Sequence, residues 1–259
     1  MHLFASLVFP PIGHLTQWKG ILFKGTPIEV NKTVLIMWVS VALVFWLFYT
    51  ASRRASLVPT GVQNLAEAAI DFVQNGIILQ TMGEEGLSFT PFLVAVFGFI
   101  LVCNIFEIIP FVQFPANARM AFPMFGALMV WVIYNTMGIK EHGFVGYLKS
   151  QTVPSGVPKA LLLIVIPIEF LSNFILRPFS LAVRLFANEL AGHLLLVTFA
   201  VLSTTLLTAH AVFLKPISVL PAAMLVALTG FELLVAVLQA FIFTILTGVY
   251  IAAATSHEH

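Results

Sequence analysis

Ionisable side chains inside two long apolar runs are the residues of this sequence most able to do chemistry. The runs cover residues 161–207 and 217–254. A charged group in a lipid bilayer costs about 3 kcal/mol or more, so such groups are rare and usually functional. The ionisable members are Glu169, Arg177, Arg184, Glu189, His193 and Glu232, accompanied by the amides Asn188 and Gln239. Together they indicate the movement of an ion.

Arg184 lies in the middle of the first apolar run. A guanidinium keeps its proton in proteins, so it cannot relay protons. It can instead act as a fixed positive charge that attracts a passing carboxylate and blocks a leak. The alternative is an arginine that reaches toward the membrane surface or pairs with a glutamate. For Arg177, nearer the start of the run, both interpretations stay open.

Helical spacing divides the first run into two faces. Positions three and four apart share one face of a helix. One face carries Arg177, Ser180 or Leu181, Arg184, Asn188 and Ala191. His193 follows Arg184 by nine positions, about 180° around the helix, and Glu189 precedes His193 by four. We therefore expect an arginine face and, behind it, a face that can take up and release protons.

The second run carries a matching polar face. Glu232 and Gln239 are seven positions apart, so they lie on the same side of a helix. Packing this side near His193 would assemble a polar path. The alternative, for Glu232 or His193 taken singly, is an interhelical hydrogen bond that only holds the bundle together. Their presence in one chain favours a path.

The composition places most of the chain in lipid. Of 259 residues, 60% are hydrophobic and 9% are charged, against about 25% charged in soluble domains. The mean hydropathy is +1.03. A net charge of +1 gives no basic surface for nucleic acid. The single cysteine, Cys103, lies in an apolar run and excludes an internal disulfide. No metal or cofactor site is expected.

The apolar segments predict the fold. Three spans cover 34–49, 91–109 and 122–137. The run 161–207 would be about 70 Å long as one helix, whereas the hydrocarbon core is about 30 Å thick. We therefore predict an all-α membrane protein with about five membrane-embedded helices. The last two are long, tilted and packed as a hairpin over 160–255, with the first of them kinked at a proline. Residues 62–80 form an amphipathic helix at the membrane surface, with Gln63, Glu67, Asp71 and Gln74 on its polar face and Val62, Leu65, Ala66, Ala69, Ile70 and Val73 on its apolar face.

The distribution of positive charge predicts the orientation. Arg53 and Arg54 follow the first span and place its end inside. Five spans then place Lys140, Lys149 and Lys159 inside as well. We expect residues 1–33 to form a tail outside the membrane, and residues 34–259 to form a single membrane domain whose C-terminus lies inside.

Three segments carry a resemblance to a known family. Residues 177–196, RPFSLAVRLFANELAGHLLL, closely resemble the signature of subunit a of the F-type ATP synthase. Residues 238–250, LQAFIFTILTGVY, are similar to the C-terminal motif of that family. Residues 104–110, NIFEIIP, resemble a third segment of it. The resemblance extends from the first span to the C-terminus.

The resemblance implies a role beside a rotating ring of c subunits. Subunit a supplies two offset half-channels through which protons reach and leave a ring carboxylate. Arg184 matches the essential arginine of the family, which attracts that carboxylate and separates the half-channels. Asn188 and Gln239 match polar positions near it. His193 and Glu232 match a titratable pair of the outer half-channel.

Other candidate positions agree less closely with the family. Asn104 and Glu107 come with the third segment and are, with Arg177 and Ser180, additional polar candidates. Glu169 lies one residue from the spacing of a family acid. Many relatives read Gly-Asn-Met where this chain has Ala187-Asn188-Glu189. Glu189 is therefore an extra acid on the back face, to which the resemblance gives no role.

The resemblance also implies partners and location. The partners are the c-subunit ring, b-type peripheral stalk subunits, the remainder of the synthase and the lipid bilayer. No Gly-x-x-x-x-Gly-Lys phosphate loop is present, so nucleotide chemistry would belong to other subunits and this chain would have no catalytic site of its own. The expected location is a bacterial plasma (inner) membrane, with the mitochondrial inner membrane as the alternative.

Two other functions compete with this one. A proton- or sodium-coupled secondary transporter would bind its solute between two repeated halves with broken helices, and no such repeat is visible. A purely structural membrane subunit would not account for Arg184 together with Glu232 and His193. The choice between proton and sodium stays open.

Overall fold

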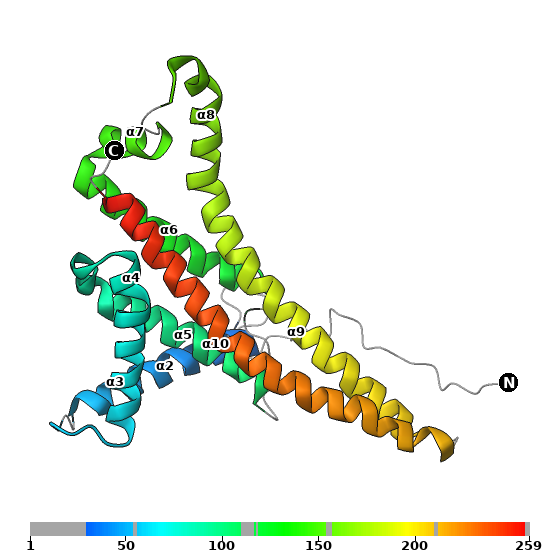
Figure 1. The fold of residues 1–259 in the computed structure, drawn as a ribbon. Coiled ribbons are helices and arrows are strands. Elements are labelled where there is room, and N and C mark those ends of the chain that lie inside the picture. The colour runs from blue at the N-terminus through cyan, green and yellow to red at the C-terminus, as the bar shows by residue number, and fades with distance from the viewer. Residues whose placement is uncertain are drawn as a thin grey trace.

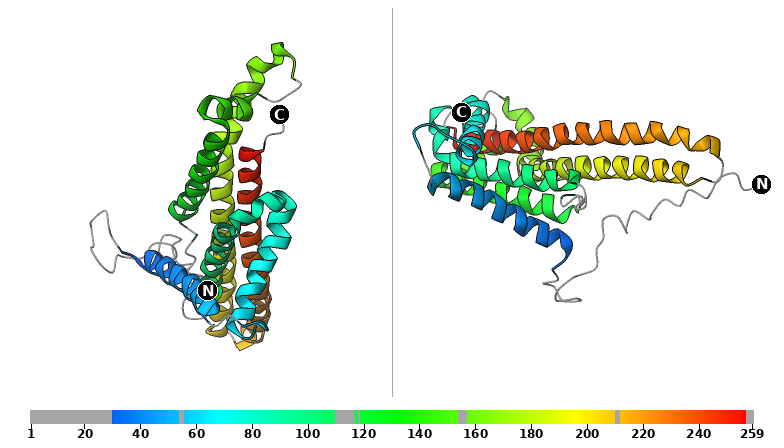
Figure 2. Two further views of the ribbon diagram at one scale, coloured as in Figure 1. Left: turned by 90° about the vertical axis from the view of Figure 1, so that its left-hand side faces the viewer. Right: turned by 90° about the horizontal axis from the view of Figure 1, so that it is seen from below.

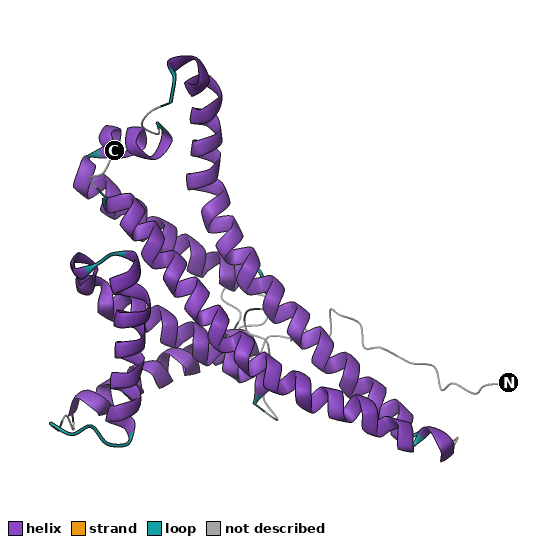
Figure 3. Ribbon diagram, in the orientation of Figure 1, coloured by secondary structure: helices purple, strands orange, loops and turns teal. Residues whose placement is uncertain are grey.

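The computed structural model describes residues 30–53, 56–109, 117, 119–153, 157–209 and 212–256, and the side chains of 159 and 160 lie outside that description. Helices make up nearly all of these residues (Figure 3). Most of the predicted N-terminal tail, Arg54, and the last three residues fall outside the described residues.

Five helical segments are long and apolar enough to cross a membrane, as the sequence predicts. The helices that form them are α2 (Lys32–Arg53), α5 (Thr90–Ile108), α6 (Ala121–His142), α8 (Lys159–Leu171) continuing into α9 (Arg177–Leu207), and α10 (Val219–Thr255). Short 3₁₀ turns precede α5 (η2, Glu84–Phe89) and α10 (η6, Pro216–Ser218), and a further one, η5, covers Val212–Leu214. The all-α membrane fold is thereby confirmed.

The last two spans form the predicted hairpin. They cover 47 and 40 residues, and α9 and α10 lie side by side from the turn that joins them toward the body of the bundle (Figures 1 and 2). The core lies where α10 meets α5, α6 and α9. Its buried side chains include Leu93, Phe97, Val130, Leu181 and Phe243. This packing brings segments far apart in sequence to the middle of the hairpin.

A π turn, η4 (Ser172–Leu176), separates α8 from α9. Pro178 has no N–H, so the carbonyl of Phe174, four residues earlier, receives no α-helical hydrogen bond. A single wide turn is a common way to absorb such a defect. The long run changes direction here, between α8 and α9 (Figure 1).

The short helix α7 (Phe144–Thr152) ties this turn to the C-terminus of α10. The Asn173 amide donates to the Gln151 carbonyl at 2.6 Å, and the Gln151 amide donates to the Ala253 carbonyl at 3.0 Å. The Tyr134 hydroxyl donates to the Asn173 carbonyl at 3.0 Å. These bonds connect α6, α7, η4 and α10, and so they fix where α9 begins.

Tyr147 anchors α7 on α6. Its ring fills the space in which a Cβ at Gly138 would lie, and its hydroxyl donates to the Asn135 Oδ1 at 3.1 Å. Burial raises the pKa of Tyr147 to about 12, and the positive charge of Arg177 offsets part of that rise. The hydroxyl therefore stays a hydrogen-bond donor at neutral pH.

The amphipathic segment is divided differently from the sequence prediction. It comprises α3 (Val62–Val73), a π turn η1 (Gln74–Ile78) and α4 (Leu79–Thr81). Gln63, predicted on the polar face, is buried and donates to Glu67 at 2.7 Å. Leu65, predicted on the apolar face, is 61% exposed. The reason is that α3 packs against α2 and α5 through its Gln63, Ala66 and Val73 side.

Candidate functional site

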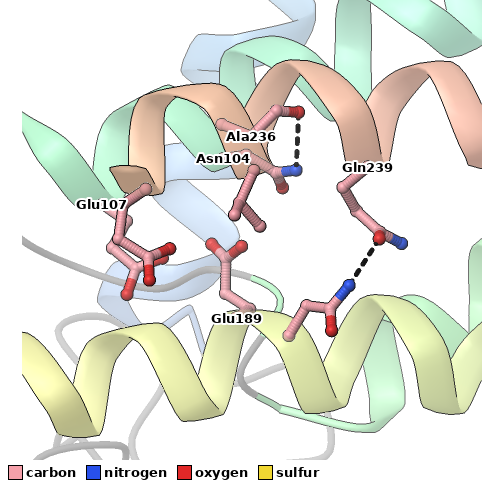
Figure 4. Close-up of a pocket in the computed structure, with 8 residues that line it drawn as sticks. Asn104, Glu107, Glu189, Ala236 and Gln239 are labelled. Carbon is pink, nitrogen blue, oxygen red and sulfur yellow. Dashed lines mark hydrogen bonds between the residues drawn. The ribbon is translucent and has the colours of Figure 1, made fainter. Parts of the chain in front are cut away.

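A small polar cavity lies where α5, α9 and α10 meet (Figure 4). Its lining consists of Asn104, Glu107, Asn188, Glu189, Glu232, Val235, Ala236 and Gln239. Asn104 and Glu107 come from α5, one turn apart, and the α9 residues come from the middle of that helix. The bundle therefore gathers most of the polar candidates in one place, including the pair that the sequence gives only as additional positions.

Amide side chains bridge the helices at this cavity. The Asn188 Nδ2 donates to the Gln239 Oε1 at 2.7 Å, joining α9 to α10. The Asn104 Nδ2 donates to the Ala236 carbonyl at 3.4 Å, joining α5 to α10. The Asn117 Nδ2 donates to the Asn104 Oδ1 at 2.7 Å. Asn117 has no counterpart in the sequence prediction, because a single amide between two spans carries no periodic signal.

His193 pairs with a glutamate of α5. Its Nδ1 lies 3.5 Å from the Glu107 Oε1, and both side chains are buried. Among the described residues, no ion pair within 4 Å joins His193 to Glu232. The Glu232 carboxyl packs instead against Gly192, where an added Cβ would overlap it. The titratable groups thus form one cluster, in which the direct partner of His193 is Glu107.

A double-mutant cycle measures this pairing. We expect His193→Ala and Glu107→Gln each to lower the thermal stability of the protein, and the double variant to lose less than the two single losses combined. Residues in contact usually couple by about 0.5–3 kcal/mol. Thr244→Val serves as the control partner, because the Thr244 hydroxyl bonds only within its own helix, to the Ala240 carbonyl. Additive losses for His193 and Glu107 would contradict the pairing.

Glu189 and Gln239 each bring an unpartnered polar atom to the cavity. Both side chains are buried, with 6% and 3% of their surface exposed. The Glu189 Oε1 and the Gln239 Nε2 have no hydrogen-bond partner. Buried polar atoms are nearly always hydrogen-bonded to protein or water. Each of these two atoms can therefore still form a hydrogen bond with a species that enters the cavity.

Arg184 lies on the open face of α9, which also carries Ser180, Ala187, Asn188 and Ala191. These residues are exposed, whereas the other side of the helix packs into the core. No hydrogen bond, ion pair or ring contact joins Arg184 to another of the described residues. Asn188 both lines the cavity and belongs to the open face. It therefore stands between the cluster and the arginine.

The remaining candidates lie before the cavity along the chain: Arg177 and Ser180 begin α9, and Glu169 lies near the end of α8. Arg177 is twelve residues from Glu189, about 18 Å along a helix. The Arg177 guanidinium lies 5.3 Å from the centre of the Tyr250 ring, so the interpretation as an internally paired arginine gains support. The Ser180 hydroxyl donates to the Arg177 carbonyl at 3.3 Å. Glu169 accepts from Asn173 at 3.4 Å. The structure does not bring these residues to the cavity.

The π turn at 172–176 lies between Glu169 and Arg184. A π turn holds one more residue per turn than an α-helical turn allows. An acid that precedes the turn is therefore one residue further from Arg184 in sequence than it would be in an unbroken α-helix. This is the size of the departure at Glu169.

Five apolar spans around a buried cluster of ionisable side chains define a multi-pass integral membrane protein. The family described as ATP synthase A chain matches residues 34–252. A protein of a Nocardioides species named ATP synthase subunit a is 41% identical over 230 residues, covering 89% of this chain and 83% of that protein. The chain therefore belongs to the ATP synthase A chain family, and the resemblance inferred from its motifs is confirmed.

Further relatives are also bacterial. A protein of the same name from Frankia alni is 45% identical over 188 residues, covering 71% of this chain and 64% of that protein. Another, from Acidiphilium cryptum, is 40% identical over 189 residues, covering 73% of each chain.

Proposed function

We propose that this chain is the proton-translocating subunit a of an F-type ATP synthase, with Arg184 separating two half-channels beside the c-ring. The observation that carries the proposal is the division of α9 into two faces. An arginine without a partner among the described residues lies on the open face, and a cluster of titratable side chains lies behind it. A fixed positive charge and a group of proton-binding side chains on opposite sides of one helix suit a protein that protonates and deprotonates a carboxylate moving past it.

The open face of α9 is suited to a passing helix. Ala187 and Ala191 are small, so a neighbouring backbone can approach closely. A partner with one carboxylate per helix would meet Arg184 between them. The deprotonated carboxylate would be attracted to the guanidinium, and a neutral one would move away into lipid. We assign the open face to the c-ring on this chemistry.

The cluster behind the open face suits one half-channel. A proton would pass from the His193–Glu107 pair and Glu232 toward Asn188 and Gln239, which stand beside the open face. Imidazole and carboxyl groups exchange protons readily near neutral pH, whereas the guanidinium does not. Glu169, in α8 on the far side of the π turn, is the candidate acid of the second half-channel, and Arg177 and Ser180 follow it at the start of α9.

The proposal extends to partners and location. Membership in the family supports the remainder of the synthase as the partner, including b-type peripheral stalk subunits. The bacterial relatives favour a plasma (inner) membrane over a mitochondrial one. The orientation with the C-terminus inside, and the assignment of residues 1–33 to an outer tail, remain part of the proposal.

Disulfide cross-linking tests which face meets the ring. In a background without Cys103, we expect Ala191→Cys on the open face to cross-link to a cysteine placed on the outer helix of the c subunit. Ala182→Cys is the matched control, since Ala182 is fully buried in the core. The yield is read on gels of native membranes after mild oxidation. A ring that cross-links to neither position 191 nor position 187 would overturn the assignment.

A further inference from the structure

Glu189 is the one carboxyl of the cavity that the resemblance leaves without a role, and the geometry gives it one. The side chain lies between Glu107 on one side and Gln239 on the other, pointing toward Asn104 (Figure 4). It is thus located between the titratable cluster and the amide pair that borders the open face.

We propose that Glu189 is an added proton-binding station, which receives a proton from the His193–Glu107 cluster and passes it toward the open face of α9. The inference rests on the proposed function and deepens it. The transfer needs no other reactant: an N–H or O–H bond breaks in the cluster, an O–H bond forms at Glu189, and the same proton then leaves. No electrons are exchanged.

The unpartnered oxygen is the first support for this role. A carboxyl group retained only for packing would have its oxygens bonded, because an unpaired polar atom in a low-dielectric interior is costly. The Glu189 Oε1 has no hydrogen-bond partner, although only 6% of the side chain is exposed. A group that takes up and releases a proton needs such a free site.

The surrounding charges are the second support. Glu107 of α5 and Glu232 of α10 line the same cavity as Glu189, and the buried thiol of Cys103 lies one turn before Glu107 on α5. His193 lies one turn along α9 and binds Glu107. Among the described residues, no cation forms an ion pair with Glu189. Carboxylates around one cavity repel each other unless a proton neutralises one of them. A proton shared among these acids therefore relieves repulsion wherever it resides.

The position is the third support. Without Glu189, the cluster and the open face would be joined only by amides, and an amide is a poor proton acceptor. A methionine at this position would have similar length but no proton to exchange. Glu189 would therefore increase the rate at which this chain delivers protons, without being indispensable to the machine.

The test compares substitutions at this position in the assembled synthase. We expect Glu189→Met and Glu189→Gln to reduce passive proton flux through the membrane sector several-fold and to alter its dependence on pH, while Glu189→Asp restores most of both. The amount of assembled complex is measured for each variant. Unchanged flux and pH dependence in Glu189→Met, or an assembled Glu189→Asp as impaired as Glu189→Met, would overturn the proposal.

A second measurement covers variants that fail to assemble. Val235 lines the same cavity. In a background without Cys103, the Val235→Cys synthase should be inhibited by Ag⁺, compared with the same variant untreated, if protons and water reach the cavity. A Val235→Cys enzyme insensitive to Ag⁺ would overturn the proposal. If Glu189→Met leaves proton flux unchanged while Arg184→Ala abolishes ATP synthesis, only this inference is overturned. If Arg184→Ala still supports ATP synthesis, the proposed function itself is overturned.

Discussion

ATP synthesis driven by a proton gradient should fall below detection when Arg184 is replaced by alanine. The protein should still insert and assemble, because Arg184 is exposed on the open face of α9 and forms no hydrogen bond or ion pair with the other residues that the structure describes. The physical reason is the loss of a positive charge that faces out from the middle of α9 and can attract a deprotonated ring carboxylate. Synthesis is measured in inverted vesicles against the amount of assembled complex.

Arg177→Ala is the matched control for this variant. It removes a guanidinium from the same helix, but one that rests on the Tyr250 ring 5.3 Å away. A cation–π contact contributes about 0.5–2 kcal/mol. Arg177→Ala should therefore lower the stability of the protein more than it lowers ATP synthesis driven by the proton gradient. Normal ATP synthesis in Arg184→Ala would defeat the central role given to that residue.

Replacing Glu232 with glutamine should give the second largest effect. Glutamine keeps the shape that packs against Gly192 but cannot carry a proton. Loss of a group that transfers protons typically lowers a rate by about 10²-fold or more, and we expect a reduction near the lower end because Glu107 and His193 remain. The measurement is ATP-driven proton pumping at matched complex levels.

A control on the same helix separates chemistry from packing. Thr229→Val removes a hydroxyl that bonds only to the Leu225 carbonyl of α10, and pumping should be nearly unchanged. If both driven and passive flux in Glu232→Gln equal those of the unmodified protein, Glu232 is not on the proton path.

The sequence predicts those structural features that depend on the residues of a single helix. The spacing of Arg184, Asn188 and His193 predicts two faces on α9, and the structure has Arg184 on an open face and His193 in the core. Five spans and the hairpin follow from run lengths that exceed the thickness of a bilayer. These features depend on local periodicity and burial, which a single sequence contains.

The partner of His193 could not be predicted in this way. Glu107 is on α5, far earlier in the chain, and the contact exists only because α5 packs into the hairpin. The sequence favoured Glu232, which comes close to α9 but meets Gly192 instead. The side of α3 that packs against the bundle could not be predicted either, since Gln63 finds partners inside the bundle while Leu65 faces out.

The π turn at 172–176 is a third feature that the sequence alone does not predict. The prolines on either side of it, Pro167 and Pro178, are visible in the sequence. Whether a helix accommodates a missing N–H by kinking or by widening one turn depends on the neighbouring helices. Here Asn173 is held by Tyr134 and Gln151 from two other helices. The displaced spacing of Glu169 is a consequence that becomes intelligible only with that turn in view.

Passive proton conductance with a locked ring shows whether Arg184 separates two half-channels. The ring is cross-linked to this subunit, the catalytic sector is removed, and proton flux across the membrane is measured. With Arg184 present, locking should stop the flux, because protons can pass only by riding on the ring. In Arg184→Ala we expect flux to persist through the locked ring, since the charge separating the two half-channels is gone. A locked Arg184→Ala complex as tight to protons as the unmodified one would contradict it.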